Sequence, residues 1–396
     1  MKKDASLEGL RGYACLVVVL SHCIYAFWPE MHGAYISETS SAWAVAMFNS
    51  PFTAVYNGTI AVYVFFVLSG YVLSLSFFRK KEATIVQSLF LRRHLRLAIP
   101  ITAACLLMYM LHRIGAFSTQ SNSLHPWVTQ FYQGEYSLSG AIYSGMVSSL
   151  LNGDGSYNFV LWTMTIEFYG SILVFANCLL LSGVKKRFIV YCIECAALVI
   201  AANYWGYFMI CFLVGTFLAE VKNNNQTLST SNAATFLLLA FALYLGGFHT
   251  QSASYGYVAN FKEVYSGIYV GHASIFYTIS ASAIMYCVAF NGSVSKFLSS
   301  QTASFWGSIS FSLYLVHSLI LRSVGVFSFS IFELYGLRYN LSALFSSALV
   351  FCVSIIVAVA FRHIDGLSLR VSKAFESFLM SARPSKLIEN ARMRQL

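Results

Sequence analysis

Apolar residues form long, nearly uninterrupted runs along the chain, and the stretches between the runs hold most of the charged residues. Crossing the hydrocarbon layer of a bilayer takes about 20 residues of helix, and we count ten runs long enough to cross. They cover residues 9–28, 57–78, 97–112, 158–182, 188–204, 205–221, 233–248, 268–290, 305–325 and 341–361. A closed β-barrel would instead show short strands of alternating polarity. The pattern therefore predicts an all-α, polytopic transmembrane helical bundle with about ten spans.

The positively charged residues are distributed unevenly around these spans. If the N-terminus is cytoplasmic, 21 of the 25 Lys and Arg residues fall on the cytoplasmic side, which leaves Arg113, Lys262, Arg322 and Arg338 on or near the outer side. Cytoplasmic loops of membrane proteins carry such an excess of basic residues. We therefore predict that both termini are cytoplasmic. Topology also accounts for the net charge of +10, and nucleic acid is excluded as a partner because no compact soluble basic domain is present.

Composition supports the same class of protein. Hydrophobic residues make up 58% of the chain and charged residues only 10%, against about 25% charged residues in soluble domains. Most of the nine cysteines lie in apolar runs, and the one close pair, Cys192 and Cys195, has no second pair to complete a zinc site. We interpret the cysteines as packing thiols and predict no metal site. The first run lacks a small-residue cleavage site, so no cleavable signal peptide is expected.

The first run holds an arginine and a histidine that a helix would place on one face. Arg11 and His22 are eleven residues apart, which is three helical turns, or about 16 Å along the axis. Ionisable groups inside a bilayer are costly, so they are candidate functional residues. The structural alternative is that Arg11 reaches the interface and His22 packs between helices.

A basic cluster directly precedes the third run, where the sequence reads "RRHLRLAIP". Arg93 and Arg96 are three residues apart and project together from a helix. Paired guanidinium groups fit phosphates well, so the cluster is a candidate anion site. The alternative is the cytoplasmic excess of basic residues alone.

Three further runs contain polar residues that are candidates for a site. Ser69 and the glycine after it favour close helix contact or ligand binding. Glu167 lies inside the fourth run, where a carboxylate must find a partner or be protonated, whereas Trp162 suits the membrane interface. In the ninth run, His317 follows Tyr314 by three residues, on roughly the same helical face.

Five segments in chain order resemble the motifs of the acyltransferase 3 family, which are polytopic membrane O-acyltransferases. "LRGYACLVVVLSH" resembles the family's Arg-x10-His signature, and "FFVLSGYVLS" its Ser-Gly-aromatic motif. "RRHLRLAIP", "LWTMTIEFYGS" and "SISFSLYLVHS" are similar to its Arg-x-x-Arg, Trp-x4-Glu and Tyr-Leu-x-His motifs, and "FRHIDGLSLRVS" to its closing segment. The fourth of these segments and "RLAIP" resemble fungal members of the family more than bacterial ones. Glu8 stands where many members have Asp. No SGNH esterase domain is expected after the tail.

The resemblance implies a function. Such an enzyme moves an acyl group, usually acetyl, from cytosolic acyl-CoA to a hydroxyl of a carbohydrate or of another small or lipid-linked acceptor. Acyl-CoA is then a co-substrate, with no resident cofactor. The resemblance implies that His22 is the general base and that Glu167 orients its imidazole. The residues expected to bind the donor are Arg11, Arg93, Arg96 and Ser69. Trp162, Tyr314 and His317 are expected to support the site. Arg11 and His22 should line one continuous tunnel, and both direct transfer and an acyl-histidine intermediate remain open.

We divide the chain into a transmembrane domain, residues 1–365, and a cytoplasmic amphipathic and basic tail, residues 366–396. In the tail, Val371, Phe375 and Phe378 share one helical face among Arg and Lys residues, which is typical of a helix lying on the inner leaflet. The sequence is consistent with the plasma membrane and with an endomembrane.

Two other functions fit parts of the sequence. A secondary transporter would use ten spans and the intramembrane residues His22, Glu167 and Glu194, but no internal repeat is evident. A catalytically inactive scaffold is opposed by the presence of all five motifs. The role of Glu194 stays open.

Overall fold

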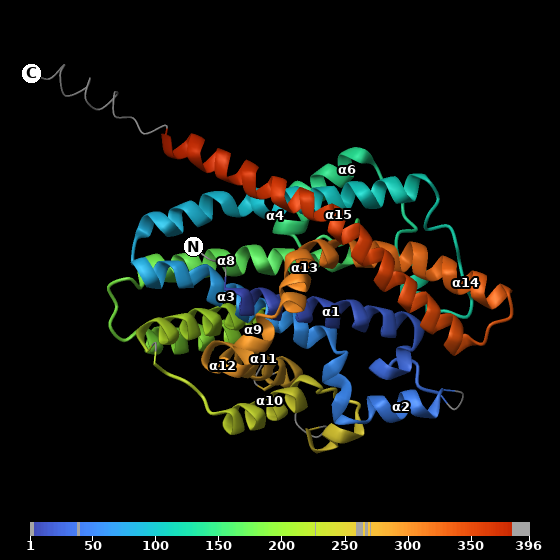
Figure 1. The fold of residues 1–396 in the computed structure, drawn as a ribbon, viewed down its shortest axis with the longest axis horizontal. Coiled ribbons are helices and arrows are strands. Elements are labelled where there is room, and N and C mark those ends of the chain that lie inside the picture. Colours follow the sequence, from blue (N-terminus) through green and yellow to red (C-terminus); the bar gives the residue numbers. More distant parts are fainter. Residues whose placement is uncertain are drawn as a thin grey trace, which may run out of the picture.

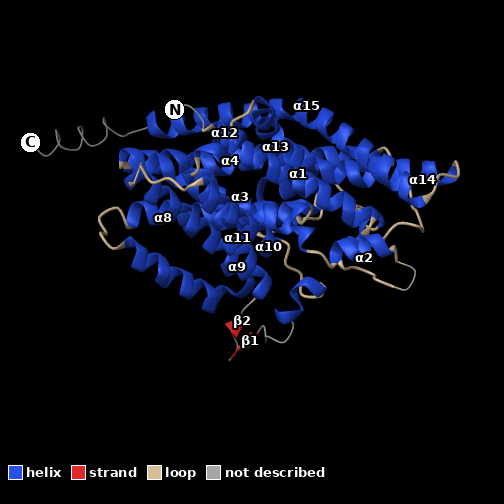
Figure 2. Ribbon diagram, turned by 60° about the horizontal axis from the view of Figure 1, so that its bottom comes forward, coloured by secondary structure: helices blue, strands red, loops and turns tan. Residues whose placement is uncertain are grey.

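The computed structural model describes residues 4–381 except 38–39, 226, 259–263, 266–267 and 270, and except the side chains of residues 202–204, 264–265 and 268–269. Lys262 and tail residues 382–396 lie outside the described part. Helices dominate the fold (Figures 1 and 2). An antiparallel pair of two-residue strands, with Val264 opposite Tyr269, lies at one edge of the bundle and contacts the helix Arg187–Asn224 (Figure 2).

The elements follow one another along the chain with these bounds. They are α1 (Ala5–Phe27), η1 (Pro29–His32), α2 (Ala42–Phe48), η2 (Pro51–Val55), α3 (Gly58–Lys80), α4 (Ala83–Arg113), α5 (Pro126–Thr129), α6 (Leu138–Tyr143), η3 (Ser144–Ser148), α7 (Ser149–Leu151), η4 (Phe159–Leu161), α8 (Trp162–Leu180), α9 (Arg187–Asn224), α10 (Asn232–Gly246), η5 (Ala253–Val258), β1 (Val264–Tyr265), β2 (Ile268–Tyr269), α11 (His272–Phe290), α12 (Gly292–Leu298), α13 (Gln301–Ile320), η6 (Leu321–Gly325), α14 (Val326–Leu334) and α15 (Tyr339–Ser381).

The predicted all-helical fold class is confirmed, and many of the helices suit a membrane. Within the described residues, eight helical segments are long and apolar enough to cross a bilayer. Two of the ten predicted runs correspond to shorter helices. One is α10, which has 15 residues, and the other is the first part of α9.

Helix α9 covers both the fifth and the sixth predicted run, yet its two ends lie together. A straight helix would separate residues 187 and 220 by about 50 Å. In the structure, Arg187 Nη1 lies 3.0 Å from Glu220 Oε1, and the ring centroids of Phe188 and Phe217 are 5.4 Å apart. The chain therefore reverses direction within α9, and its two arms match the two runs that the sequence separates only weakly.

Glycines allow the closest helix contacts in the bundle. A Cβ atom on Gly12 of α1 would lie 2.5 Å from the backbone nitrogen of Gly307 in α13, and one on Gly307 would lie 2.3 Å from the Glu8 carbonyl oxygen. Likewise, a Cβ on Gly70 of α3 would lie 2.2 Å from the Phe212 carbonyl oxygen in α9. On the other side of α1, a Cβ on Gly58 of α3 would lie 2.9 Å from the Cβ of Ser21, so α1 lies between α3 and α13. The face of α1 that carries Arg11 and His22 thus lies beside the predicted site residues of α13.

The α1–α13 contact yields a stability prediction. Replacing Gly307 by alanine is expected to lower the thermal unfolding temperature of the purified protein, because the new methyl group must displace backbone atoms of α1. Overpacking of this kind costs about 1–3 kcal/mol. Gly292→Ala is the control, since no atom lies within 4 Å of its added Cβ. Equal unfolding temperatures for Gly307→Ala and the wild type would show that the two helices can separate freely.

Basic residues from distant parts of the sequence gather at one end of the bundle, which we call the basic end. The guanidinium of Arg187 lies over the ring of Phe78 at the end of α3, and Lys222 of α9 lies over Phe290 at the end of α11. Arg96, close to the middle of α4, pairs with Asp365 in the C-terminal half of α15. The clustering agrees with the predicted charge distribution. Assignment of the basic end to the cytoplasm stays a prediction.

Helix α15 runs without a break through the boundary predicted between residues 365 and 366. Its C-terminal end lies on the same side of the bundle as the N-terminus (Figure 1). A second ion pair, of 3.1 Å between Arg92 Nε and Glu376 Oε2, fastens this extension to α4. The tail thus begins as a continuation of the last long helix. The apolar side chains expected on one face stay at least partly exposed, as the ring of Phe378 is 69% exposed.

Candidate active site

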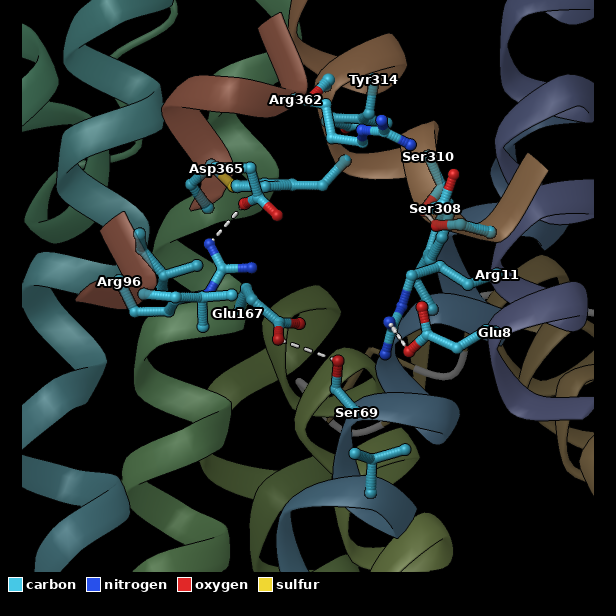
Figure 3. A pocket seen from close by; sticks show the side chains of 18 of the residues that line it. Glu8, Arg11, Ser69, Arg96, Glu167, Ser308, Ser310, Tyr314, Arg362 and Asp365 are labelled. Carbon is cyan, nitrogen blue, oxygen red and sulfur yellow. Dashed lines mark hydrogen bonds and ion pairs between the residues drawn. The ribbon is translucent and has the colours of Figure 1, made fainter. Parts of the chain in front are cut away.

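A cavity of about 730 Å³ opens among six helices at the basic end, and we call it the chamber. Helices α1, α3, α4, α8, α13 and α15 each contribute to its wall (Figure 3). Its charged lining residues are Glu8, Arg11, Arg93, Arg96, Glu167, Arg362 and Asp365. The structure thus brings together the four residues predicted to bind the donor, since Arg11, Arg93, Arg96 and Ser69 all line this one cavity.

Two of the arginines are paired with carboxylates near the mouth of the chamber. Arg11 donates to Glu8 Oε1 at 2.8 Å, one helical turn away. Arg96 Nη1 donates to Asp365 Oδ1 at 2.5 Å and to Ser368 Oγ at 2.9 Å. Both arginines keep further N–H groups, because a guanidinium has five. Arg362 of α15 is exposed and also lines the chamber, so guanidinium groups outnumber carboxylates there by four to three.

Deeper in the chamber, Glu167 joins two helices. Its carboxylate accepts a hydrogen bond of 2.8 Å from Ser69 Oγ and forms an ion pair with Arg93 (Figure 3 shows the serine contact). The side chains of Arg93 and Glu167 are only 14% and 15% exposed. Arg93 Nε is buried and has no hydrogen-bond partner among the described residues. A buried donor without a partner is costly. The Arg93 Nε–H is therefore a candidate donor to a bound ligand.

The partner of His22 is His317. The sequence predicts that Glu167 orients the His22 imidazole, but the structure pairs Glu167 with Ser69 and Arg93 instead. His22 Nδ1 lies 2.8 Å from His317 Nε2, and His317 Nδ1 lies 3.1 Å from the Leu313 carbonyl oxygen. Whether His22 faces Glu167 or His317 depends on how each helix is rotated about its axis. That rotation is set by packing against neighbouring helices.

The carbonyl group of Leu313 determines where the protons lie in this pair. A carbonyl oxygen only accepts, so His317 Nδ1 carries the hydrogen and, in the neutral ring, His317 Nε2 is an acceptor. His22 must then donate through Nδ1 to His317. In neutral His22 the lone pair is consequently on Nε2, the nitrogen that His317 does not contact. This tautomer is the one a general base needs.

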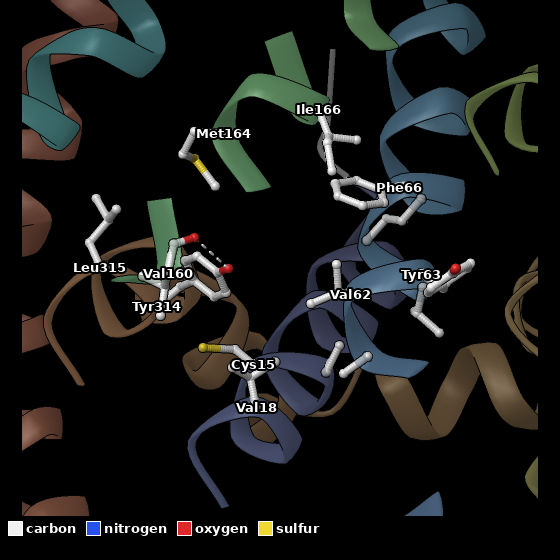
Figure 4. Packing of buried hydrophobic residues seen from close by; sticks show 14 of the residues in the cluster. Cys15, Val18, Val62, Tyr63, Phe66, Val160, Met164, Ile166, Tyr314 and Leu315 are labelled. Atoms are coloured by element: carbon white, nitrogen blue, oxygen red, sulfur yellow. Dashed lines mark hydrogen bonds between the residues drawn. The ribbon is translucent and has the colours of Figure 1, made fainter. Parts of the chain in front are cut away.

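Tyr314 separates the chamber from the histidine pair. Its side chain lines the chamber, and its ring centroid lies 5.9 Å from that of His317. The Tyr314 hydroxyl lies 2.8 Å from Thr163 Oγ1 and donates to the Val160 carbonyl oxygen (Figure 4). His22 is not among the residues lining the chamber. The continuous tunnel expected from Arg11 to His22 is therefore closed at Tyr314 in this structure.

Trp162 lies apart from both the chamber and the histidine pair. Its side chain is 37% exposed and packs against Phe208, with ring centroids 5.8 Å apart. This position fits packing at the bundle surface better than contact with a substrate. Two aromatic residues that the motifs do not single out contact His22 instead, namely Trp127 at 5.9 Å and Phe159 at 5.2 Å between centroids.

Sequence comparison identifies the family. The model of the acyltransferase 3 family, described as an acyltransferase domain, matches residues 4–363. The chain is also similar to the O-acetyltransferase PaAT-1 of Phomopsis amygdali, with 25% identity over 418 aligned positions that cover 93% of this chain and 83% of that protein. No solved structure matches it. These matches favour the enzyme over the transporter that the sequence left open. The chain belongs to the acyltransferase 3 family and is an integral membrane acyltransferase.

Proposed function

We propose that this enzyme transfers an acyl group, acetyl in the first instance, from cytosolic acyl-CoA to a hydroxyl of a carbohydrate or of another small or lipid-linked acceptor. His22 acts as the general base. The observation that carries the proposal is the chain of contacts from the Leu313 carbonyl through His317 to His22, which leaves the lone pair on His22 Nε2. A hydroxyl is a weak nucleophile and needs such a base.

The chamber supports acyl-CoA as the donor. CoA carries several phosphate charges, and guanidinium groups bind phosphates through paired N–H donors. Arg11, Arg96 and Arg362 line the chamber at the basic end, while Arg93 has a free buried Nε. The ion pairs with Glu8 and Asp365 use only part of the donor capacity of Arg11 and Arg96. Phosphates thus have N–H groups available without complete loss of these pairs.

We propose direct transfer of the acyl group, without a covalent intermediate on the protein. The acceptor oxygen attacks the thioester carbonyl carbon while its proton moves to His22 Nε2. The carbon–sulfur bond then breaks, and the leaving CoA thiolate takes the proton from the His22 imidazolium. His317 Nε2 holds the Nδ1 hydrogen of His22 throughout, so it orients the ring as a carboxylate does in other histidine-dependent enzymes. If rapid-quench experiments trapped protein acylated on His22, the reaction would proceed through an acyl-histidine intermediate and not by direct transfer.

The test uses purified full-length protein, radiolabelled acetyl-CoA and a panel of hydroxyl acceptors. Acceptor-dependent release of CoA thiol, with label recovered in the acceptor, is the expected result. Label that stays in acetyl-CoA with every acceptor, in protein that binds acetyl-CoA, would contradict the proposed transfer.

Arg93 offers a test of donor binding. Arg93→Gln is expected to raise the KM for acetyl-CoA about 10- to 100-fold, because a charge-assisted hydrogen bond worth about 1.5–3 kcal/mol is lost. It also leaves the Glu167 carboxylate buried without its cation. The double variant Arg93→Gln/Glu167→Gln is expected to regain thermal stability but not the low KM. A wild-type KM in the double variant would limit the Arg93–Glu167 pair to a structural role.

Tyr314 offers a test of the closed passage. Tyr314→Ala is expected to raise the hydrolysis of acetyl-CoA without acceptor at least about fivefold, because water then reaches the thioester and His22 together. Tyr314→Phe keeps the ring and is expected to stay near the wild-type rate. The measurement is thiol release in the absence of acceptor. Unchanged release in Tyr314→Ala would show that this ring does not separate the two compartments.

A further inference from the structure

A group of aromatic side chains packs against His22 in addition to His317. Phe159 of η4 and Trp127 of α5 contact the imidazole ring itself. Tyr25, one turn after His22 in α1, packs edge-on against Trp127 with centroids 4.8 Å apart. None of these three side chains lines the chamber. His22 therefore lies between two environments, one leading to the donor cavity through Tyr314 and the other aromatic.

Further aromatic residues continue this group from His22 toward the surface of the protein. Tyr25 also contacts the rings of His32 and His125, and Tyr35, which is 71% exposed, lies 4.1 Å from His125 between centroids. Tyr25, His32, His125, Trp127 and Phe159 are each partly accessible to solvent. We call the six residues Tyr25, His32, Tyr35, His125, Trp127 and Phe159 the outer aromatic cluster. The cluster thus combines partial exposure to solvent with direct ring contacts to His22 through Trp127 and Phe159.

One polar atom in this cluster lacks a partner. His125 Nδ1 accepts a hydrogen bond of 3.0 Å from the Trp127 backbone N–H, so in the neutral ring the hydrogen is on Nε2. His125 Nε2 is buried and has no hydrogen-bond partner among the described residues. A buried N–H without an acceptor is costly. A ligand oxygen at this position would satisfy it.

The cluster carries no formal charge near neutral pH. None of its six members is Asp, Glu, Lys or Arg. Burial lowers the pKa of His32 to about 4 and also lowers the pKa of His125, so both imidazoles are neutral at pH 7. A charged molecule would lose hydration here without gaining a counterion, which is unfavourable. Aromatic rings instead suit a flat, uncharged, partly apolar surface.

We propose that the outer aromatic cluster is the acceptor site and that it selects uncharged alcohols with an apolar ring face. That face packs on Trp127 and Phe159, the reacting hydroxyl meets His22 Nε2, and a second oxygen of the acceptor accepts from His125 Nε2–H. Both a sugar ring and a fused alicyclic alcohol have this chemistry. The inference rests on the proposed function, because it takes His22 as the base.

The first experiment measures which molecules bind and react. Phenyl β-glucoside and phenyl β-glucuronide form a matched pair that differs by one carboxylate, and 2-decalol represents the alicyclic source. Binding is measured by equilibrium dialysis against the full-length protein in nanodiscs without acyl-CoA, and transfer with labelled acetyl-CoA. The glucoside or the decalol is expected to bind at least tenfold more tightly than the glucuronide, and the tighter of the two identifies the source. Equal binding of the glucuronide would overturn the proposal.

The second experiment alters the cluster. Trp127→Leu removes the stacking surface and is expected to raise the KM of the preferred acceptor at least tenfold. His125→Asn keeps an acceptor for the Trp127 N–H but places no donor at the position of the imidazole Nε2, and a three- to tenfold increase in the acceptor KM is expected. The KM for acetyl-CoA should not change in either variant. Trp43→Leu is the control, since Trp43 is 46% exposed, packs on Trp28 and lies outside the cluster.

The outcomes separate this inference from the proposed function. If transfer proceeds with wild-type acceptor KM in Trp127→Leu and His125→Asn, the acceptor site lies elsewhere while the enzyme's activity stands. If Trp127→Leu loses glucoside or decalol binding but no variant or wild-type protein transfers acetyl groups, the binding site stands and the proposed reaction fails.

Discussion

Replacing His22 by alanine is expected to reduce acyl transfer by about 10²- to 10⁴-fold, the range that a positioned general base supplies. The KM for acetyl-CoA should stay close to the wild-type value, because His22 does not line the chamber. The measurement is steady-state transfer of labelled acetyl groups by detergent-purified protein. Elution volume in size-exclusion chromatography and thermal unfolding would show that the variant is folded.

His363→Ala is the matched control for this substitution. His363 lies on α15 and is exposed, so its loss should leave transfer unchanged. Transfer by His22→Ala at a rate within threefold of His363→Ala would remove His22 from the reaction.

His317→Met is expected to lower kcat about 100-fold with little change in either KM. Methionine fills similar space but offers no good acceptor to His22 Nδ1–H, so the His22 ring loses both its orientation and its preferred tautomer. Misplacing the proton on a catalytic histidine is known to be costly in other enzymes. The measurement is kcat with a saturating acceptor.

His317→Gln separates this role from simple packing. The glutamine Oε1 occupies the place of the imidazole Nε2 and can accept the same hydrogen, so at least a tenfold recovery relative to His317→Met is expected. Equal kcat values for the Met and Gln variants would mean that His317 acts through its volume and not through its acceptor nitrogen.

The sequence predicts which residues share the chamber more successfully than it predicts their individual partners. The four residues that the family resemblance implies for donor binding, Arg11, Arg93, Arg96 and Ser69, line one cavity, and Glu167, which was expected beside His22, lines it with them. Pairing between them depends on how each helix is rotated, and that rotation follows from contacts such as Gly12 on Gly307. No pattern within one run reports this rotation.

The remaining differences between the predictions and the structure lie in the loops and in the last helix. Trp127 and Phe159 belong to short helical turns in or beside an irregular stretch, where aromatic residues show no period that marks them as site residues. Asp365 lies in a segment that composition assigns to the edge of a tail, yet α15 continues and carries it into the chamber wall. Tyr314 occupies the predicted face of α13, but the closure it makes depends on Thr163 and Val160 of another segment.

Nitrogen-15 NMR of histidine-labelled protein tests whether His22 has the tautomer of a general base, because it distinguishes ring nitrogens that carry a hydrogen from those that carry a lone pair. The signals of His22 are assigned by their loss in His22→Gln. At a pH where the His22 ring is neutral, we expect a protonated Nδ1 and an unprotonated Nε2 for His22, and the same arrangement for His317. A hydrogen on His22 Nε2 would contradict it, since that nitrogen then has no lone pair with which to accept the proton of an alcohol.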